Sequence, residues 1–439
     1  MRAILKPILL IVLFAAAAAA GPAGAVTIQE VVSPKGVRAW LVEDRSVPLV
    51  SMRFAFKGGS TQDPESKEGL ATLMSSMFDE GAGALSSEAF QMAVDEAGAE
   101  MGFSAGPDAI HGGIRTLAET REKSFDLLRL AVNEPRFDAE PFERIRGQIL
   151  AGLAAQANDP EAQAQRRWDE ALWGDHPYAR PEIGTEASLA RISPADLQSF
   201  HAGQLARSNL IVGVVGAIDA ETLKGELDRI FGDLPEKPEL RPVGPAEPQL
   251  GQELRVAYDL PQATLRLAYP GVSRDDPDFF AAHLMVEILG GDGMASRLFT
   301  EVREKRGLSY GVGASLSTRE HGDVLQIGTA TSADKAGETL ALIKDVVRRM
   351  AEEGPTAEEL DAVKRFVTGA FAINNLGSSS GVAATLVDLQ MQELGRDYME
   401  RRAAIIDAVT LEDVKRVARE LLTAQPTVMV VGPETKAGP

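Results

Sequence analysis

Residues 234–251 read LPEKPELRPVGPAEPQLG and decide the fold of this chain, because they divide it into two halves of comparable length. Proline lacks a backbone N–H and cannot support a helix or a central strand, so the stretch is expected to be semi-extended. The prolines that carry this interpretation are Pro235, Pro238, Pro242, Pro245 and Pro248. The sequence therefore predicts a linker over residues 235–251, between an N-terminal domain over residues 26–234 and a C-terminal domain over residues 252–439.

The two halves show the same order of elements. Each begins with two strand-like runs, continues with a polar turn and an apolar-periodic helix, and closes with a Val-rich strand that ends in glycine. The paired segments, first half before second, are residues 37–42 and 254–258, 49–56 and 264–269, 69–78 and 279–289, and 209–216 and 427–432. Further helical patterns cover residues 120–132, 142–156, 336–353 and 357–371. This order predicts a duplicated α+β domain.

Composition excludes several classes of function. The chain has 439 residues, with Lys+Arg 45 against Asp+Glu 64 and a net charge of −19, so it is a poor partner for nucleic acid. It contains no cysteine, which excludes disulfides, iron–sulfur clusters, thiol nucleophiles and Cys-ligated zinc. The five histidines are His111, His176, His201, His283 and His321. Any metal or acid–base site must use these imidazoles or carboxylates.

Residues 1–25 read MRAILKPILLIVLFAAAAAAGPAGA and have the three parts of a secretory signal. Arg2 and Lys6 form the basic start, an apolar run follows, and Ala23-Gly24-Ala25 is an A-x-A cleavage site. The apolar run is short for a membrane span of about 20 residues. We therefore expect a cleaved signal and an exported, periplasmic protein without a membrane anchor.

Three stretches resemble the pitrilysin/insulinase and mitochondrial processing peptidase family. They are GGSTQDPESKEGLATLMSSMFDEGA at residues 58–82, DHPYARPEIGTEASLARISPADLQSFH at 175–201, and LGGDGMASRLFTEVREKRGLSYGVGASLS at 289–317. The resemblance implies two homologous α/β domains, each an antiparallel-rich sheet packed with helices, that form half of a clamshell around a peptide chamber. Active members of the family are zinc peptidases with an H-x-x-E-H helix and a more distant Glu ligand.

The zinc motif of that family is missing from this chain. Thr72 replaces the first His, Ser75 the Glu and Ser76 the second His, and neutral hydroxyls neither hold zinc well nor take a proton from water. The distal ligand segment corresponds to Ala151 and Gly152, which have no metal-binding side chain. We therefore expect no metal and no cofactor in this chain, and zinc in a partner subunit.

A second family feature is retained in the C-terminal half. Arg303 and Tyr310 resemble an Arg and a Tyr, seven residues apart, that reach the active site of the other domain and stabilise the substrate carbonyl. A guanidinium and a phenol both supply hydrogen-bond donors to an oxyanion. Gly307 is expected to end the helix after Arg303, so that a strand begins near Tyr310. The alternative is purely structural: basic residues at a helix C-terminus and a half-buried tyrosine.

Two other features invite a functional interpretation. His283 and Glu287 lie four residues apart on a predicted helix, but no third metal ligand accompanies them, so we favour a structural role. The segment GSSSG at residues 377–381 is expected to be a flexible loop beside the chamber.

These observations predict an exported, non-zinc subunit of a heteromeric metalloendopeptidase. It would pair with a homologous zinc-bearing subunit, form half of the chamber for unfolded peptides, and supply Arg303 and Tyr310 to the partner's zinc site. Alone it would be inactive. The alternative is a non-catalytic peptide-binding or scaffolding protein of the same fold.

Overall fold

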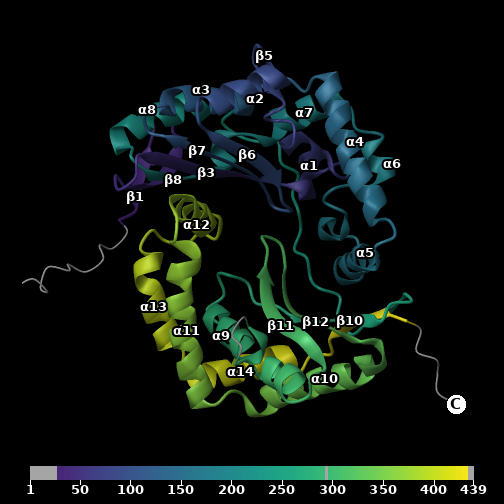
Figure 1. The fold of residues 1–439 in the computed structure, drawn as a ribbon. Coiled ribbons are helices and arrows are strands. Elements are labelled where there is room, and N and C mark those ends of the chain that lie inside the picture. Colours follow the sequence, from purple (N-terminus) through teal and green to yellow (C-terminus); the bar gives the residue numbers. More distant parts are fainter. Residues whose placement is uncertain (1–26, 292–294, 434–439) are drawn as a thin grey trace, which may run out of the picture.

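The computed structural model describes residues 27–291 and 295–433, which form two lobes (Figure 1). The secretory signal predicted at residues 1–25 lies outside the described residues. The irregular segment after Leu234 runs between the lobes without helix or strand up to β9 at Glu253–Ala257. Among the described residues, no helix combines the length and the apolar character needed to cross a bilayer.

The N-terminal lobe is built on a six-stranded sheet in the order β1-β2-β8-β3-β7-β6. Its strands are β1 Gln29–Val32, β2 Arg38–Glu43, β3 Leu49–Lys57, β6 Glu100–Ala105, β7 Ala109–Leu117 and β8 Leu210–Gly216. All neighbours are antiparallel except β2 and β8. A separate hairpin pairs β4 Gly81–Ala82 with β5 Leu85–Ser86. Phe54 and Phe56 of the central strand β3 are buried with the side chains of the outer helices in one core.

The C-terminal lobe repeats this sheet in the order β11-β12-β10-β13-β9. Its strands are β9 Glu253–Ala257, β10 Gln262–Pro270, β11 Ser309–Thr318, β12 Asp323–Ser332 and β13 Thr427–Gly432. Here too one pair is parallel, β13 with β9, and the rest are antiparallel. The order β6-β7-β3-β8-β2 of the first lobe thus matches β11-β12-β10-β13-β9 of the second. The duplicated, antiparallel-rich α+β architecture is confirmed.

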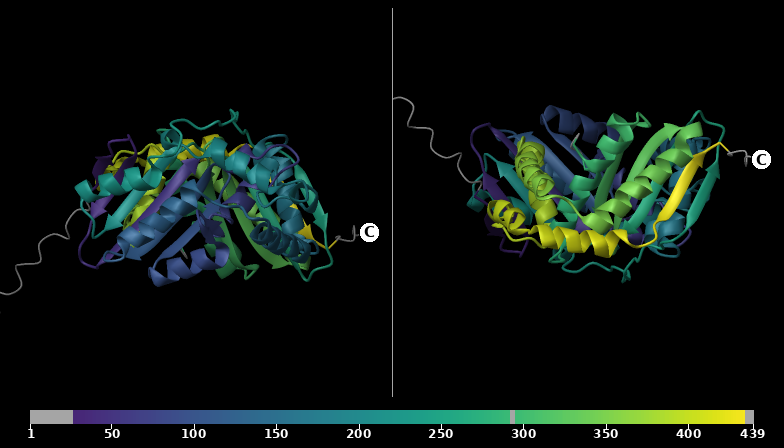
Figure 2. Two further views of the ribbon diagram at one scale, coloured as in Figure 1. Left: turned by 90° about the horizontal axis from the view of Figure 1, so that it is seen from above. Right: turned by 90° about the horizontal axis from the view of Figure 1, so that it is seen from below.

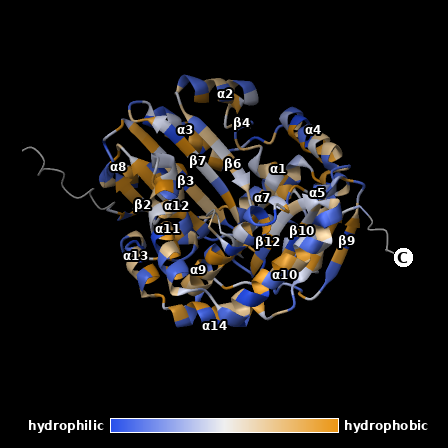
Figure 3. Ribbon diagram, turned by 60° about the horizontal axis from the view of Figure 1, so that its bottom comes forward, coloured by the Kyte–Doolittle hydropathy of each residue, from blue (hydrophilic) through white to orange (hydrophobic). Residues whose placement is uncertain are grey.

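Helices cover the faces of both sheets. In the N-terminal half they are α1 Leu70–Ser75, α2 Ser87–Glu96, α3 Arg121–Asn133, α4 Ala139–Gln156, α5 Pro160–Trp173, α6 Glu186–Leu189, α7 Pro194–Gln204 and α8 Ala220–Phe231. In the C-terminal half they are α9 Phe279–Gly290, α10 Ala336–Glu353, α11 Ala357–Asn375, α12 Ser379–Met391, α13 Tyr398–Ala408 and α14 Leu411–Leu422. Short helical turns are η1 Ser60–Gln62, η2 Pro177–Ala179, η3 Arg207–Asn209, η5 Ala333–Lys335 and the π-helical η4 Phe299–Glu304. The outer helices α10 and α14 carry both hydrophobic and hydrophilic residues, as one-sided burial requires (Figure 3).

Each lobe lends one helix to the other. Helix α12 of the C-terminal half packs on strands β8 and β3 of the N-terminal sheet, with Leu386 fully buried. Helix α5 of the N-terminal half packs on β13 of the C-terminal sheet, where Trp168 is 1% exposed. Figures 1 and 2 show α12 beneath the N-terminal sheet and α5 beside the C-terminal one. Because α5 follows α4 as α12 follows α11, this exchange is symmetric within the duplication.

Two local expectations are corrected by the structure. The helix expected at residues 69–78 is only α1, Leu70–Ser75, and ends in a turn. The segment at residues 377–381 is not a flexible loop: Ser378 caps α12 by accepting a hydrogen bond of 3.1 Å from the Gly381 N–H. The proline-rich segment is extended, as expected, but Arg241 within it donates to the carbonyl oxygens of Gln62 and Asp63.

Candidate functional site

The hydroxyls at the former zinc positions bond to the backbone around α1. Thr72 Oγ1 donates to the Glu182 carbonyl oxygen at 2.7 Å, and the Ser75 and Ser76 hydroxyls both donate to the Thr72 carbonyl oxygen, at 3.0 and 2.8 Å. Ser75 is 2% exposed, and Ser76 lies just past the last residue of the helix. These groups act as local backbone partners and are not arranged around a central ion.

The start of α1 is fixed by a buried carboxylate. Asp63 Oδ2 accepts from the Gly69 N–H at 2.8 Å and Oδ1 from the Ala71 N–H at 2.9 Å, and Gly69 has φ +91°, a conformation that favours glycine. Burial raises the pKa of Asp63 to about 7, although these two hydrogen bonds oppose the rise. The Asp63 carboxylate therefore binds the backbone N–H groups at the start of α1 and does not replace the lost zinc ligands.

The distal ligand positions offer nothing to a metal. Ala151 and Gly152 are both exposed on α4, and nothing lies within 4 Å of a Cβ built on Gly152. Within residues 27–291 and 295–433, no group of three or more His, Asp or Glu side chains is arranged to hold a metal ion. The residues present do not fit a zinc ion.

Arg303 belongs to η4 and Tyr310 to β11, both in the C-terminal half of the chain, whereas α1 belongs to the N-terminal lobe (Figure 1). Gly307, with φ +61°, ends the helical segment, and β11 begins at Ser309, as the sequence predicts. Tyr310 is 89% exposed and sits where the pairing of β11 with β12 shifts register between Ser309 and Val312. Such bulges re-aim a side chain, here away from the core. Tyr310 is therefore not the half-buried packing residue of the structural alternative.

The charged neighbours of Arg303 are occupied elsewhere. Glu301 pairs with both Lys305 and Arg306 at 2.7 Å, and these hydrogen bonds lower the pKa of Glu301 to about 2. Arg303 packs instead on the Phe299 ring, with Cζ 4.7 Å from its centroid, and has no ion pair among the described residues. Its guanidinium and the Tyr310 hydroxyl thus remain available to a ligand or a partner.

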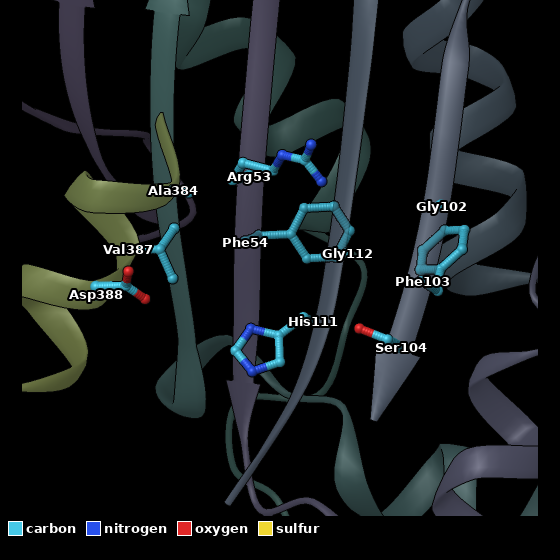
Figure 4. Close-up of a pocket in the computed structure, with 10 residues that line it drawn as sticks. All are labelled: Arg53, Phe54, Gly102, Phe103, Ser104, His111, Gly112, Ala384, Val387 and Asp388. Carbon is cyan, nitrogen blue, oxygen red and sulfur yellow. The ribbon is translucent and has the colours of Figure 1, made fainter. Parts of the chain in front are cut away.

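A trough lies on the inner face of the N-terminal sheet, beside α12. Two adjoining cavities of about 360 and 250 Å³ share Arg53 and Gly102. Arg53 comes from β3, His111 from β7 and Ser104 from β6, while Asp388 closes one side from α12 (Figure 4). Because α12 covers only β8 and β3, strands β7 and β6 keep this face open.

Strand β6 is the edge of the sheet and borders the trough. Its residues alternate, with Glu100, Gly102 and Ser104 exposed and Met101 and Phe103 partly buried against the core. An edge strand leaves backbone N–H and C=O groups unpaired on one side, and an extended peptide satisfies them by adding a strand. The trough therefore has the backbone, the charge and the depth to hold an extended peptide.

A hydrogen-bond junction ties the two lobes together near the linker. Tyr178 Oη donates to the Asp108 carboxylate at 2.8 Å and accepts from the His321 N–H at 3.0 Å. Asp108 also accepts from the Glu320 N–H at 3.2 Å, and His176 Nε2 lies 3.1 Å from the Gly244 carbonyl oxygen of the linker. The two equivalent hairpins, β6–β7 and β11–β12, meet here. The junction fixes the lobes relative to each other.

Sequence reasoning found the lost zinc motif and the Arg/Tyr pair but missed the trough. Arg53, His111 and Arg115 project from one face of the sheet. The available signal was that each lies two residues from a small residue, Ala55, Ala109 or Gly113, and a period of two places such residues on one face of a strand. What a single sequence does not reveal is that α12 stops short of β7 and leaves that face open.

Comparison with known proteins matches this architecture. A family model described as "Insulinase (Peptidase family M16)" matches residues 38–186, and one described as "Peptidase M16 inactive domain" matches residues 191–367. The crystal structure of a peptidase M16 inactive domain from Pseudomonas fluorescens is 30% identical, covers 94% of this chain and 99% of its own, and has a TM-score of 0.88.

Some curated relatives are named as proteases, and one is named as a non-peptidase homolog. An uncharacterized zinc protease of Mycobacterium tuberculosis is 27% identical over 430 residues, covering 94% of this chain and 95% of the relative. A non-peptidase homolog of Helicobacter pylori is 25% identical over 366 residues, covering 83% and 84%. Together with the missing zinc ligands, these matches lead to one assignment. The chain belongs to the insulinase family, peptidase family M16, and Thr72, Ser75 and Ser76 stand at the positions of that family's zinc motif.

Proposed function

We propose that this protein is the non-zinc subunit of a heteromeric insulinase-type endopeptidase. The observation that carries the proposal is an asymmetry within the chain. The hydroxyls at Thr72, Ser75 and Ser76 are bonded to backbone carbonyls, whereas the Arg303 and Tyr310 side chains are exposed and form no ion pair or hydrogen bond with the described residues. Two exposed hydrogen-bond donors at the family's spacing, in a chain whose zinc positions are substituted, support a role for this chain in a partner's catalysis.

The role of this chain's residues follows from their chemistry. Arg303 supplies fixed N–H donors and Tyr310 one O–H donor, and both are suited to a carbonyl oxygen that becomes negatively charged. The trough beside β6 orients an extended peptide through backbone hydrogen bonds. Zinc held by the partner subunit would supply the activated water. A chamber between two such chains selects unfolded peptides as substrates.

Export belongs to the same proposal. Residues 1–25 support cleavage after Ala25, which would release the mature protein into the periplasm. The mature chain from a periplasmic fraction should begin at Val26 in an intact-mass measurement, and a chain that retains its first 25 residues would contradict export.

The experiment reconstitutes the complex with the zinc-bearing M16 subunit that co-purifies from the native cell. This chain alone should hold no stoichiometric zinc by elemental analysis and should not cleave a fluorogenic peptide. In the complex, Tyr310→Phe or Arg303→Ala should lower kcat by about 10²–10³ if the donor stabilises an oxyanion. A rise confined to KM would mean that the residues only position the peptide.

Lys305→Ala is the matched control, because Lys305 lies on the same segment but is paired with Glu301. It should leave both constants unchanged. If neither Tyr310→Phe nor Arg303→Ala changes the kinetics while size-exclusion shows intact assembly, the trans-catalytic role is wrong.

A second candidate function is a peptide-binding or scaffolding protein that takes no part in hydrolysis. The trough favours it, because binding there requires neither a metal nor a partner. Peptide binding by this chain alone, with no zinc-bearing subunit recovered from the native cell, would support this alternative.

A further inference from the structure

A further cavity, of about 250 Å³ and distinct from the two that form the trough, lies in the C-terminal lobe among α9, α11, α12 and α13. Two arginines line it, Arg274 from the segment before α9 and Arg402 from α13, together with the rings of Phe279 and Phe371. Asp388 of α12 lines both this cavity and the trough on the N-terminal sheet. The cavity is therefore a neighbour of the peptide trough and separate from the former zinc helix.

Neither arginine has a carboxylate partner. Arg402 is only 9% exposed, and its Nη1 donates to the Val367 carbonyl oxygen at 3.2 Å. Arg274 donates from Nη2 to Tyr398 Oη at 2.7 Å and from Nε to Gln392 Oε1 at 2.9 Å. Within the part of the chain that the structure describes, no acidic side chain lies within ion-pair distance of either guanidinium. Two positive charges thus share one cavity in a protein whose net charge is −19.

One neighbouring titratable group, His283, responds to this positive charge. Burial, together with the charges of Arg402 and Arg274, lowers the pKa of His283 to about 4. His283 is therefore neutral near pH 7 and adds no positive charge of its own. Burial raises the pKa of the Asp388 carboxyl, which also lines this cavity but forms no ion pair with Arg274 or Arg402 among the described residues.

Ring contacts offset part of the cost of burying these charges. Arg274 Cζ lies 4.1 Å from the Phe279 ring centroid and Arg402 Cζ lies 4.4 Å from that of Phe371. Cation–π contacts occupy the faces of the guanidinium groups and leave N–H edges free for an anion. An isolated buried charge is costly unless a counter-charge joins it. The missing counter-charge points to an anionic ligand.

We propose that this cavity binds the carboxylate group of an organic anion with an apolar body. A guanidinium binds a carboxylate through two parallel N–H···O bonds, and the rings of Phe279 and Phe371 provide the apolar wall. Inorganic phosphate fits less well, because the rings would strip its water without replacing the hydrogen bonds. The volume admits a ligand about the size of one amino-acid residue. Two sources share this chemistry: the free C-terminus of a peptide and a small organic acid. The inference does not require the zinc-bearing partner.

Isothermal titration of the full mature chain separates these sources. The probes are N-acetyl-Ala-Phe with a free C-terminus, the same peptide as its C-terminal amide, 3-phenylpropionate and inorganic phosphate. We expect the free acid to bind at least tenfold more tightly than the amide. Equal affinity of 3-phenylpropionate would identify a small organic acid as the ligand class, and binding of the peptide acid alone would identify peptide C-termini.

Two variants test the cavity itself. Gln392→Glu is nearly isosteric and places a carboxylate where Oε1 already lies 2.9 Å from Arg274 Nε, so it supplies an internal counter-ion. It should weaken binding of the acid about tenfold and raise the Tm. Arg402→Met removes one of the two charges and should weaken binding at least as much. Arg401→Gln is the matched control on the same helix, since Arg401 pairs with Asp397 at 2.6 Å and does not line the cavity, and it should bind as the wild type does.

The proposal is overturned if neither carboxylate probe binds the wild-type chain. It is also overturned if phosphate binds as tightly as the organic acids, or if folded Gln392→Glu keeps the wild-type affinity. Gln392→Glu is expected to stabilise the fold, so unfolding would not explain a loss of binding in that variant. The test therefore holds even if Arg402→Met is unstable.

Discussion

At the scale of single residues, the side chains at the family's zinc positions form hydrogen bonds with the backbone. The hydroxyls of Ser75 and Ser76 close hydrogen bonds to the Thr72 carbonyl oxygen within α1, and Asp63 satisfies two N–H groups at its start. The first N–H groups of a helix have no intrahelical partner, and Asp63 supplies one here, whereas the two serine hydroxyls share the Thr72 carbonyl oxygen with the Ser76 N–H. The same positions in a zinc peptidase must instead face a metal.

Asp63 gives this arrangement a measurable pH dependence. Its pKa is about 7 in the folded protein against 3.8 as a free side chain, because of burial, so the folded state binds the proton more tightly than the unfolded state. The free energy of unfolding should therefore fall as pH rises from about 4 to 7, by at most about 1.4 kcal/mol per pH unit from this group. Asp63→Asn should remove that slope in urea titrations at successive pH values.

Asp44→Asn provides a control of opposite sign. Hydrogen bonds from Ser46 lower the pKa of the exposed Asp44 carboxyl, so any effect of this variant should appear below about pH 4 as stability that the wild type loses on acidification. Parallel stability curves for wild type and Asp63→Asn between pH 4 and 7 would show that Asp63 is ionised throughout.

At the scale of elements, helices α5 and α12 are the parts that make two sheets into one molecule. Helix α12 approaches β8 so closely that a Cβ on Gly213 would lie 2.5 Å from the Ala383 carbonyl oxygen. Gln390 adds a hydrogen bond of 3.0 Å from its Nε2 to the Val212 carbonyl oxygen. The helix that covers half of the inner face also defines the wall of the trough, through Asp388. The contact of α12 with β8 therefore both packs the two lobes together and limits access to the trough.

Gly213→Ala tests this close approach. The added methyl group must push α12 away from β8, and overpacking of this kind costs about 1–3 kcal/mol. Gly225→Ala on α8 is the matched control, because nothing lies within 4 Å of its Cβ and helical Gly→Ala changes stabilise by about 1 kcal/mol. Thermal unfolding followed by circular dichroism should therefore move the two Tm values in opposite directions. A neutral Gly213→Ala would mean that α12 is loosely held.

At the scale of the whole molecule, each lobe is incomplete without the other. The inner face of the N-terminal sheet needs Val382, Leu386 and Val387 of α12, and the C-terminal sheet needs Trp168 and Trp173 of α5. The Tyr178–Asp108 junction adds hydrogen bonds between the equivalent hairpins. The contact between the lobes is thus built on buried apolar side chains, whereas the contacts that join independent domains are more polar.

We therefore expect the two lobes to unfold together. Scanning calorimetry of the mature chain should give one transition whose calorimetric and van't Hoff enthalpies agree. The N-terminal half alone, residues 27–251, should expose its inner sheet face and Trp168 and should fail to form a compact monomer. Two separate transitions, or a stable isolated half with dispersed NMR signals, would contradict this coupling.

The sequence alone determined the duplicated α+β class, the strands β2, β3, β8, β9, β10 and β13, the lost zinc motif and the turn at Gly307, because these depend on local periodicity and on residue chemistry. It also placed Arg303 and Tyr310 on a helical end and a strand, and their role in a partner's site stays a prediction. Two local expectations were wrong. The helix at residues 69–78 ends at Ser75, and Met77 and Phe78 are buried in the turn that follows. Residues 377–381 include the start of a helix, which Ser378 caps.

Only the tertiary structure decided the exchange of α5 and α12, the trough beside β6 and the cavity between Arg274 and Arg402. Each brings together segments that lie more than a hundred residues apart, such as Arg53 with Asp388 or Arg274 with Arg402. Periodicity reports which side of an element is buried, but not which element buries it. Where a surface stays open is therefore a property of the packed molecule, set by how far α12 reaches across the sheet.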